Sequence, residues 1–281
     1  MDWNRRLDPG MSWPGVSGIT TLTTSAGAEE GNRNLEQYDR LHDVLRMALH
    51  GSYAAPLEMV SSILDVGCGS GKWTREAAAH FPHAGVTGID VRPASAKGEP
   101  EPQNYRFIAA NVLDGLPFLD ATFDYVHMRM VLTCLPAMRW PAVVRELVRV
   151  TRPGGYVELV EGGLIRNGGP ALTTLAGWML REAQARGSDP RLSQRIGELL
   201  TGAGLPEVMI REIVLPAGGE PGTPGGVVAD YLLAEVHAVR GLAISLGLTT
   251  PQEFNHMAAA LQFEMRHRTC TLPVYVAYAR R

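Results

Sequence analysis

The hydrophobic positions of this chain form short apolar runs that alternate with stretches of helical periodicity. Apolar runs of four to eight residues between turn residues are typical of buried strands, and an apolar position every three to four residues is typical of amphipathic helices. The alternation predicts an α/β protein whose strands are joined by crossovers in an open, doubly wound sheet. The predicted strands are 63–67, 85–90, 105–109, 123–128, 156–160, about 207–215 and about 271–278. The predicted helices are 35–50, 71–80, 138–150, 189–202, 227–246 and 251–266.

The same pattern divides the chain into regions. Residues 1–33 are rich in Gly, Ser, Thr, Asn and Pro, which predicts a flexible N-terminal arm. Residues 34–62 form an N-terminal helical region that we expect to pack on the core as a lid. The core is 63–281, with helical insertions at about 164–187 and 226–267. Prolines in the spacer 93–102 predict that the crossover helix expected there is short or missing.

Composition narrows the range of partners and compartments. The 281 residues are 45% hydrophobic and 20% charged, with a net charge of -3, so nothing favours a nucleic acid or an anionic membrane. The chain has 3 cysteines without metal-ligand spacing, which disfavours a disulfide framework and a zinc site and indicates the cytoplasm. We find neither a signal peptide nor a membrane-spanning run in the sequence.

The strongest local signal is the stretch 63–73, ILDVGCGSGKW, where an apolar run breaks into glycines before a helix. A phosphate-binding P-loop requires a glycine at Val66 and Ser or Thr at Trp73, so that motif is absent. A dinucleotide fingerprint requires a different glycine spacing, because Gly67, Gly69 and Gly71 are two residues apart. The stretch therefore predicts a nucleoside-type cofactor without a pyrophosphate.

Polar residues end the next two predicted strands and support that interpretation. Carboxyl ends of neighbouring parallel strands line one crevice. Asp90 is suited to accept both ribose hydroxyls, and Asn111-Val112 offers a polar group and an apolar contact to an adenine ring. Each feature alone is common in turns and strand ends, so it is their combination that indicates a cofactor site.

With these residues the chain resembles the class I S-adenosylmethionine-dependent methyltransferases. The matching segments are LDVGCGSG at 64–71, GID at 88–90, LPF at 116–118, FDYV at 123–126 and RPGGY at 152–156. FDYVHMR at 123–129 and PVYVAY at 273–278 are similar to secondary-metabolism (LaeA-like and UbiE-like) small-molecule methyltransferases. The resemblance implies a Rossmann-like sheet of about seven strands, mostly parallel with an antiparallel last strand, and helical lid insertions. Asn111 departs from the family, which often has an acidic residue there.

The resemblance implies S-adenosylmethionine as cofactor, S-adenosylhomocysteine as product, and no metal. The expected cofactor-binding residues are Tyr38, Asp65, Gly67, Cys68, Gly69, Asp90, Val91, Asn111, Val112 and Met128. The catalytic candidates are His127, Arg129 and Glu161. Each has a structural alternative: a hydrogen-bonded strand histidine, an internal ion pair and a solvated strand-end acid, respectively. Tyr38 has core packing as its alternative.

We therefore expect methyl transfer to a small, apolar or aromatic secondary metabolite, with an oxygen, carbon or nitrogen acceptor left open. Part of an apolar set is expected to wall the acceptor pocket: Trp178, Met179, Leu232, Leu233, Met257 and Phe263. The alternative is a LaeA-like regulatory or scaffolding protein that acts through partners. A nicotinamide-dependent oxidoreductase is disfavoured by the glycine spacing. Homo-oligomerisation through the arm and lid helices stays open.

Overall fold

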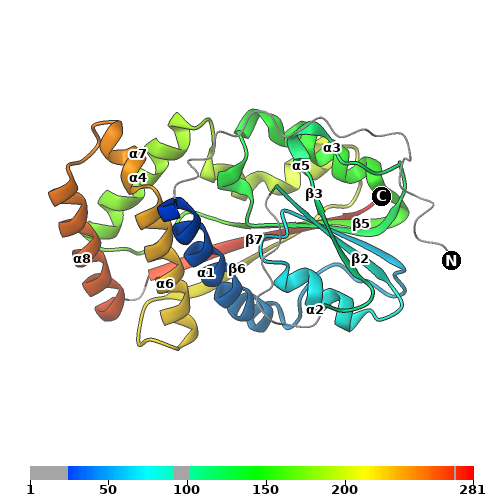
Figure 1. The fold of residues 1–281 in the computed structure, drawn as a ribbon, viewed down its shortest axis with the longest axis horizontal. Coiled ribbons are helices and arrows are strands. Elements are labelled where there is room, and N and C mark those ends of the chain that lie inside the picture. Colours follow the sequence, from blue (N-terminus) through cyan, green and yellow to red (C-terminus); the bar gives the residue numbers. More distant parts are fainter. Residues whose placement is uncertain (1–24, 92–100, 269) are drawn as a thin grey trace.

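A computed structural model of the chain contains one mixed sheet with helices on both faces (Figure 1). It describes residues 25–91, 101–268 and 270–281, so most of the predicted arm and of the spacer 93–102 lies outside the described residues. The seven strands are β1 (Ser62–Val66), β2 (Gly85–Asp90), β3 (Tyr105–Ala109), β4 (Phe123–Arg129), β5 (Thr151–Gly162), β6 (Met209–Ala217) and β7 (Cys270–Arg280).

The strand order is β3-β2-β1-β4-β5-β7-β6. The pairs among β3, β2, β1, β4 and β5 are parallel, whereas β7 is antiparallel to both of its neighbours. This confirms the predicted mostly parallel sheet with an antiparallel last strand. All five residues of β1 are buried, which explains its continuous apolar run, because helices cover both faces of the sheet.

The helices are α1 (Ser25–Leu49), α2 (Lys72–His80), α3 (Trp140–Val150), α4 (Pro170–Ala185), α5 (Ile196–Gly202), α6 (Pro224–Ala238), α7 (Arg240–Ser245) and α8 (Pro251–His267). Several predicted boundaries differ. The predicted helix 189–202 is a 3₁₀ helix at Pro190–Arg195 followed by α5, and the helix predicted from residue 138 begins at Trp140. Helix α1 begins at Ser25, ten residues earlier than its apolar stripe indicated. The predicted helix 227–246 is two helices, α6 and α7, which meet at Val239.

Strand β5 is also longer than its predicted range of 156–160. Its first residue, Thr151, pairs with Phe123, and the register then shifts before Tyr125 pairs with Tyr156. Gly154 has a φ of +84° in this irregularity. The Pro-Gly-Gly sequence after α3 therefore forms a bulge at the start of the strand.

The helices fall into groups that bury different parts of the sheet. Figure 1 shows α2 on one side of the sheet and α3 and α5 on the other. At the β5–β7–β6 end, α1 from the N-terminal region packs with α4, α6 and α8 from the second half in one apolar cluster. The N-terminal helix and the late insertions thus lie together, next to the carboxyl ends of β4 and β5. Within the described part of the chain, we find no helix with the length and apolarity needed to cross a membrane.

Candidate functional site

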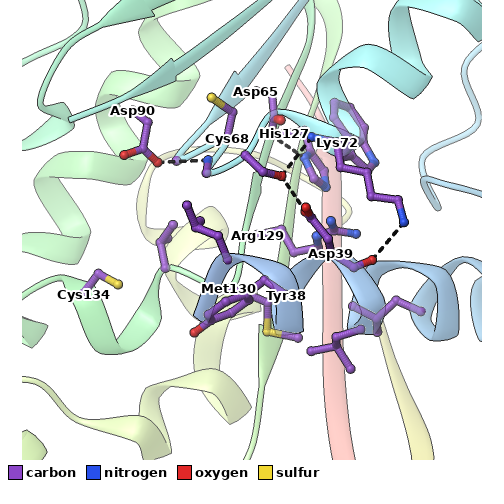
Figure 2. A pocket seen from close by; sticks show the side chains of 18 residues that line it. Tyr38, Asp39, Asp65, Cys68, Lys72, Asp90, His127, Arg129, Met130 and Cys134 are labelled. Atoms are coloured by element: carbon purple, nitrogen blue, oxygen red, sulfur yellow. Dashed lines mark hydrogen bonds and ion pairs between the residues drawn. The ribbon is translucent and has the colours of Figure 1, made fainter. Parts of the chain in front are cut away.

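A pocket lies at the carboxyl ends of β1, β2 and β4, where the loop after β1 leads into α2 (Figure 2). Gly67, Gly69 and Gly71 in this loop have φ values of +73°, +57° and +80°. This left-handed conformation is accessible to glycine at little cost and strained for other residues. A Cβ on Gly67 would also lie 2.5 Å from Val131 Cγ1. The three glycines therefore let the backbone itself form one wall of the pocket.

Asp90 stands beside this loop because of strand pairing. Val66 at the end of β1 pairs with Ile89, and the Gly67 N–H donates to the Ile89 carbonyl at 2.8 Å. The Gly69 N–H in turn donates to Asp90 Oδ2 at 3.0 Å. The carboxylate thus lies on the pocket wall next to the glycine loop, as the sequence predicted.

The predicted cofactor residues divide into two groups. One group lines the pocket: Tyr38, Asp65, Gly67, Cys68, Gly69 and Asp90. The other group does not contribute to its lining: Val91, Asn111, Val112 and Met128. The Met128 side chain is fully buried in the core, and Asn111 Oδ1 accepts the Leu113 N–H at 3.0 Å as the cap of a short helical turn. Val91 is 44% exposed, and the segment that follows it lies outside the described residues.

Helix α1 closes the opposite side of the pocket. It contributes Leu35, Tyr38, Asp39, Leu41 and Leu45 to the lining. The Ser70 hydroxyl donates to the Asp39 carboxylate. Lys72 Nζ donates to both Asp43 carboxylate oxygens at 2.8 Å and to the Asp39 carbonyl at 3.0 Å. Ser70 of the glycine loop and Lys72, the first residue of α2, thereby fasten α1 over the loop.

His127 lies on β4 inside the pocket wall and is 1% exposed. Its Nδ1 is 2.9 Å from Asp65 Oδ1, and its ring stacks on Trp73 at a centroid distance of 3.9 Å. Its Nε2 is buried without a hydrogen-bond partner among the described residues. His127 thus combines a structural contact with Asp65 and a buried ring nitrogen that has no partner among the described residues.

Arg129 at the end of β4 lines the same pocket and contacts the lid. Its Nη2 lies 3.0 Å from His42 Nδ1, and His42 Nε2 lies 2.7 Å from Glu76 Oε2. Burial and the nearby Arg129 charge lower the pKa of His42 to about 4, so the ring is neutral, accepts from Arg129 and donates to Glu76. The chain Arg129–His42–Glu76 connects β4, α1 and α2. The sequence-based alternative of an internal ion pair is wrong in detail, because the partner of Arg129 is a neutral imidazole.

His42, Asp43 and Glu76 have the side-chain types that bind metals, and their ligand atoms lie within 4.8 Å of one another. However, Asp43 is already paired with Lys72, and His42 with Glu76. We therefore assign this cluster to fastening α1 rather than to a metal.

A second pocket adjoins the first. Tyr38 and Met130 line both pockets, and Figure 2 shows them together, across the first pocket from Asp65 and Cys68. Met130 has a φ of +55°, a left-handed conformation that a non-glycine residue adopts at a cost and that is frequent at functional sites. Of the predicted apolar set, Met179 and Leu232 line this second pocket, whereas Phe263 is 65% exposed on the surface.

Glu161 lies in the wall of the second pocket and is 1% exposed. Its two carboxyl oxygens accept the N–H groups of Val131 at 3.1 Å and Leu132 at 3.2 Å. Burial raises the pKa of Glu161 to about 8. The alternative of a solvated strand-end acid is therefore wrong, because the β4–α3 loop and α6 cover this end of β5.

Another carboxyl group lies on the far wall. The Tyr38 hydroxyl donates to Glu235 Oε1 at 3.1 Å, and the Tyr38 ring meets the Tyr231 ring edge to face at a centroid distance of 5.2 Å. Burial raises the pKa of Glu235 as well. Glu235 and Tyr231 come from α6 and Tyr38 from α1, so packing of these two helices creates this polar wall.

Sequence reasoning missed the residues that join the lid to the core: Asp39, His42, Asp43, Lys72, Glu76 and Glu235. The signal available was weak. Asp39 and Asp43 are four residues apart and so share one face of the helix, yet this spacing is equally typical of a solvated surface. Only the placement of α1 against α2 shows that this face has partners.

Comparison with known proteins agrees with this geometry. Residues 63–155 match the family model of a methyltransferase domain. The chain is 33% identical to the N-methyltransferase sirN of Leptosphaeria maculans over 207 residues, which is 70% of this chain and 72% of that protein. It is 29% identical to the methyltransferase str2 of Strobilurus tenacellus over 227 residues, 75% of this chain and 80% of that protein.

Among solved structures, the fold is similar to phosphoethanolamine N-methyltransferase 2 of Haemonchus contortus in complex with S-adenosyl-L-methionine. The TM-score is 0.52 at 14% identity, and the match covers 93% of this chain and 59% of that one. At this identity the likeness concerns the fold alone.

Proposed function

Because this chain belongs to the class I S-adenosylmethionine-dependent methyltransferases, we propose that it methylates a small, apolar or aromatic metabolite of secondary metabolism. S-adenosylmethionine is its cofactor. The observation that carries the proposal is the pair of adjoining pockets, which share Tyr38 and Met130 as a common wall. One pocket then holds the cofactor and the other holds the acceptor.

The first pocket fits the cofactor on the evidence of its own residues. The glycine loop presents backbone that a Cβ would obstruct, Asp90 offers a carboxylate beside it, and His127 Nε2 is a buried ring nitrogen that lacks a partner among the described residues. We assign Asp90 to the ribose hydroxyls and Arg129 to the cofactor carboxylate. Asp65, Gly67, Cys68 and Gly69 complete the wall along the amino-acid tail. Val91, Asn111 and Val112 stay proposed adenine contacts, and Met128 supports the site only from within the core.

Methyl transfer mainly requires that the nucleophile is aligned with the methyl group and that water is excluded from the pockets. When bound, S-adenosylmethionine supplies a methyl group that is already electrophilic, so a correctly placed nucleophile needs little further activation. Helix α1 covers the cofactor pocket and is held by Lys72 and by the Arg129–His42–Glu76 chain. The lid thereby removes bulk water from the junction of the two pockets. Apolar side chains, among them Met179 and Leu232, orient the acceptor.

Titration calorimetry with S-adenosylhomocysteine and with NADH tests the cofactor assignment. We expect binding of the former and none of the latter; NADH binding without S-adenosylhomocysteine binding would contradict the proposal. Methyl-labelled cofactor is then incubated with a panel of small apolar metabolites, and transfer of label is followed by mass spectrometry. Label transferred only to proteins, with cofactor binding intact, would instead support the regulatory role that the sequence also left open.

The two-pocket arrangement has its own test. Met179→Trp places a large ring in the second pocket, so we expect a loss of turnover with unchanged S-adenosylhomocysteine affinity. Met138→Trp is the matched control, since Met138 is 85% exposed. Equal activity of both variants would show that the acceptor does not occupy the second pocket.

A further inference from the structure

The second pocket contains two carboxyl groups on otherwise largely apolar walls. Glu161 lies at the end of β5 and Glu235 on α6, and both line the pocket together with the rings of Tyr38 and Tyr231. Of the described residues that line it, none is a lysine, arginine or histidine. The remaining lining is mostly apolar and includes Met130, Met179, Leu180 and Leu232.

Resting on the proposed function, which places the acceptor in this pocket, we propose that the acceptor is a small apolar amine whose nitrogen binds between Glu161 and Glu235. An ammonium group pairs with buried carboxylates and is attracted by aromatic faces, and both features are present here. An anionic acceptor would lose its hydration in a largely apolar pocket whose described lining offers no cation, so we expect it not to bind. The apolar walls take the rest of the molecule.

The cations nearest to these two acids are already engaged. Arg129 faces Glu161 from β4 but donates to His42. Arg186 faces Glu235 from the end of α4 but pairs with Glu182, with 2.6 Å between Nε and Oε1. The other titratable groups that act on the two acids carry no positive charge: Tyr38, Cys134, Glu182 and Tyr231. Arg129 keeps its charge, because His42 is neutral, but it lines the first pocket; the described lining of the second pocket therefore lacks the positive charge that an ammonium group supplies.

Binding of an amine must release a proton. At neutral pH burial keeps Glu161 mostly protonated, because its pKa is raised to about 8, and the free amine is also protonated. An ion pair between the ammonium group and the Glu161 carboxylate forms only after the carboxyl proton has left to the solvent. Amine affinity is therefore expected to rise with pH between 6 and 8, by up to about tenfold per unit.

The remaining shared proton sets up the transfer. The Glu161 carboxylate takes the proton from the ammonium, which frees the nitrogen lone pair. The nitrogen then forms a bond with the methyl carbon as the carbon–sulfur bond breaks and its electron pair stays on sulfur. The products are the methylated ammonium and S-adenosylhomocysteine, so the positive charge moves from sulfur to nitrogen and no further reactant is required.

Calorimetry on the full chain saturated with S-adenosylhomocysteine tests this inference with three probes of similar shape: phenethylamine, 2-phenylethanol and phenylacetate. We expect phenethylamine to bind about tenfold tighter than the alcohol, and phenylacetate not to bind. Repeating the titration in two buffers of different ionisation enthalpy should show release of about one proton per amine at pH 7. Binding of the alcohol as tightly as the amine, or amine binding without proton release, would overturn the proposal.

Glu235→Gln keeps the shape of the side chain and should weaken phenethylamine binding about tenfold, with the affinity for S-adenosylhomocysteine unchanged. Glu198→Gln is the control, because Glu198 is a surface residue paired with Arg195. Unchanged amine affinity in Glu235→Gln would also overturn the proposal. Failure of S-adenosylhomocysteine to bind the wild type would contradict the proposed function instead, so the two failures are distinguishable.

Discussion

Glu161→Gln is expected to change how stability depends on pH. The folded chain holds the Glu161 proton up to about pH 8, whereas the unfolded chain loses it near the ordinary pKa of 4.5. A raised folded-state pKa means that the stability linked to this proton is complete below pH 4.5 and is lost as pH rises through 8. The slope is about 1.4 kcal/mol per pH unit, so the wild type loses about 3 to 4 kcal/mol from this group between pH 5 and 8.

The Gln variant lacks this titration but has a cost of its own. The carboxyl oxygens accept the N–H groups of Val131 and Leu132, and the amide of Gln would turn an NH2 group toward one of these donors. The lost hydrogen bond costs about 1 to 3 kcal/mol at every pH. We therefore expect the variant to be less stable than the wild type at pH 5 and equally or more stable at pH 8.

Urea unfolding followed by circular dichroism at pH 5, 6, 7 and 8 measures this difference. Other buried acids also contribute to the pH dependence, so the informative quantity is the free energy of unfolding of the variant minus that of the wild type. Glu198→Gln, at a surface residue paired with Arg195, should give a difference that does not depend on pH. A pH-independent difference for Glu161→Gln would refute the reasoning, since Glu161 would then be ionised in the folded state throughout.

Three further variants test the cofactor side. Asp90→Ala should weaken S-adenosylmethionine binding by about 1 to 3 kcal/mol through lost charge-assisted hydrogen bonds; calorimetry checks this, and an affinity equal to that of the surface variant Asp120→Ala would contradict it. Gly67→Ala should lower the free energy of unfolding by about 1 to 3 kcal/mol, because φ is +73° and the new Cβ would clash with Val131; in thermal denaturation Gly241→Ala, with open space around its Cα, should show no such loss. Arg129→Ala should lower kcat/KM, and the free energy calculated from this loss should exceed the loss in free energy of unfolding. Equal losses of the two free energies would mean that Arg129 acts only through its contact with His42.

The sheet and the cofactor loop were predictable because their signals are local. Strands β2 and β3 begin and end where their apolar runs do. The glycine loop needs left-handed backbone at fixed spacing, and no other residue supplies it as readily. Asp90 follows from the same logic, because parallel pairing brings the ends of β1 and β2 together.

Predictions failed where a neighbour distant in sequence decides the environment. The Asn111 side chain caps the turn at Leu113 through Oδ1, a hydrogen bond that the sequence did not indicate, and its contact with the adenine stays a proposal. Met128 was expected at the cofactor, but β4 buries this side chain in the core because alternate residues of a strand face opposite sides. Strand β5 is longer than predicted because Thr151 pairs with Phe123, and the apolar pattern of the sequence does not indicate this pairing.

The sequence by itself therefore determined the fold and the wall of the cofactor pocket, since both depend on backbone conformation and on periodicity within a few residues. The tertiary structure alone decided how helix α1 is held over the first pocket and which groups line the second pocket. In the sequence, Glu161 is an ordinary acid at the end of a strand; in the structure, α6 and the loop after β4 shield it from water. Glu235 is an ordinary helix residue in the sequence, whereas in the structure it accepts a hydrogen bond from Tyr38 of α1. Burial raises the pKa of both carboxyl groups, and burial cannot be deduced from a short stretch of sequence.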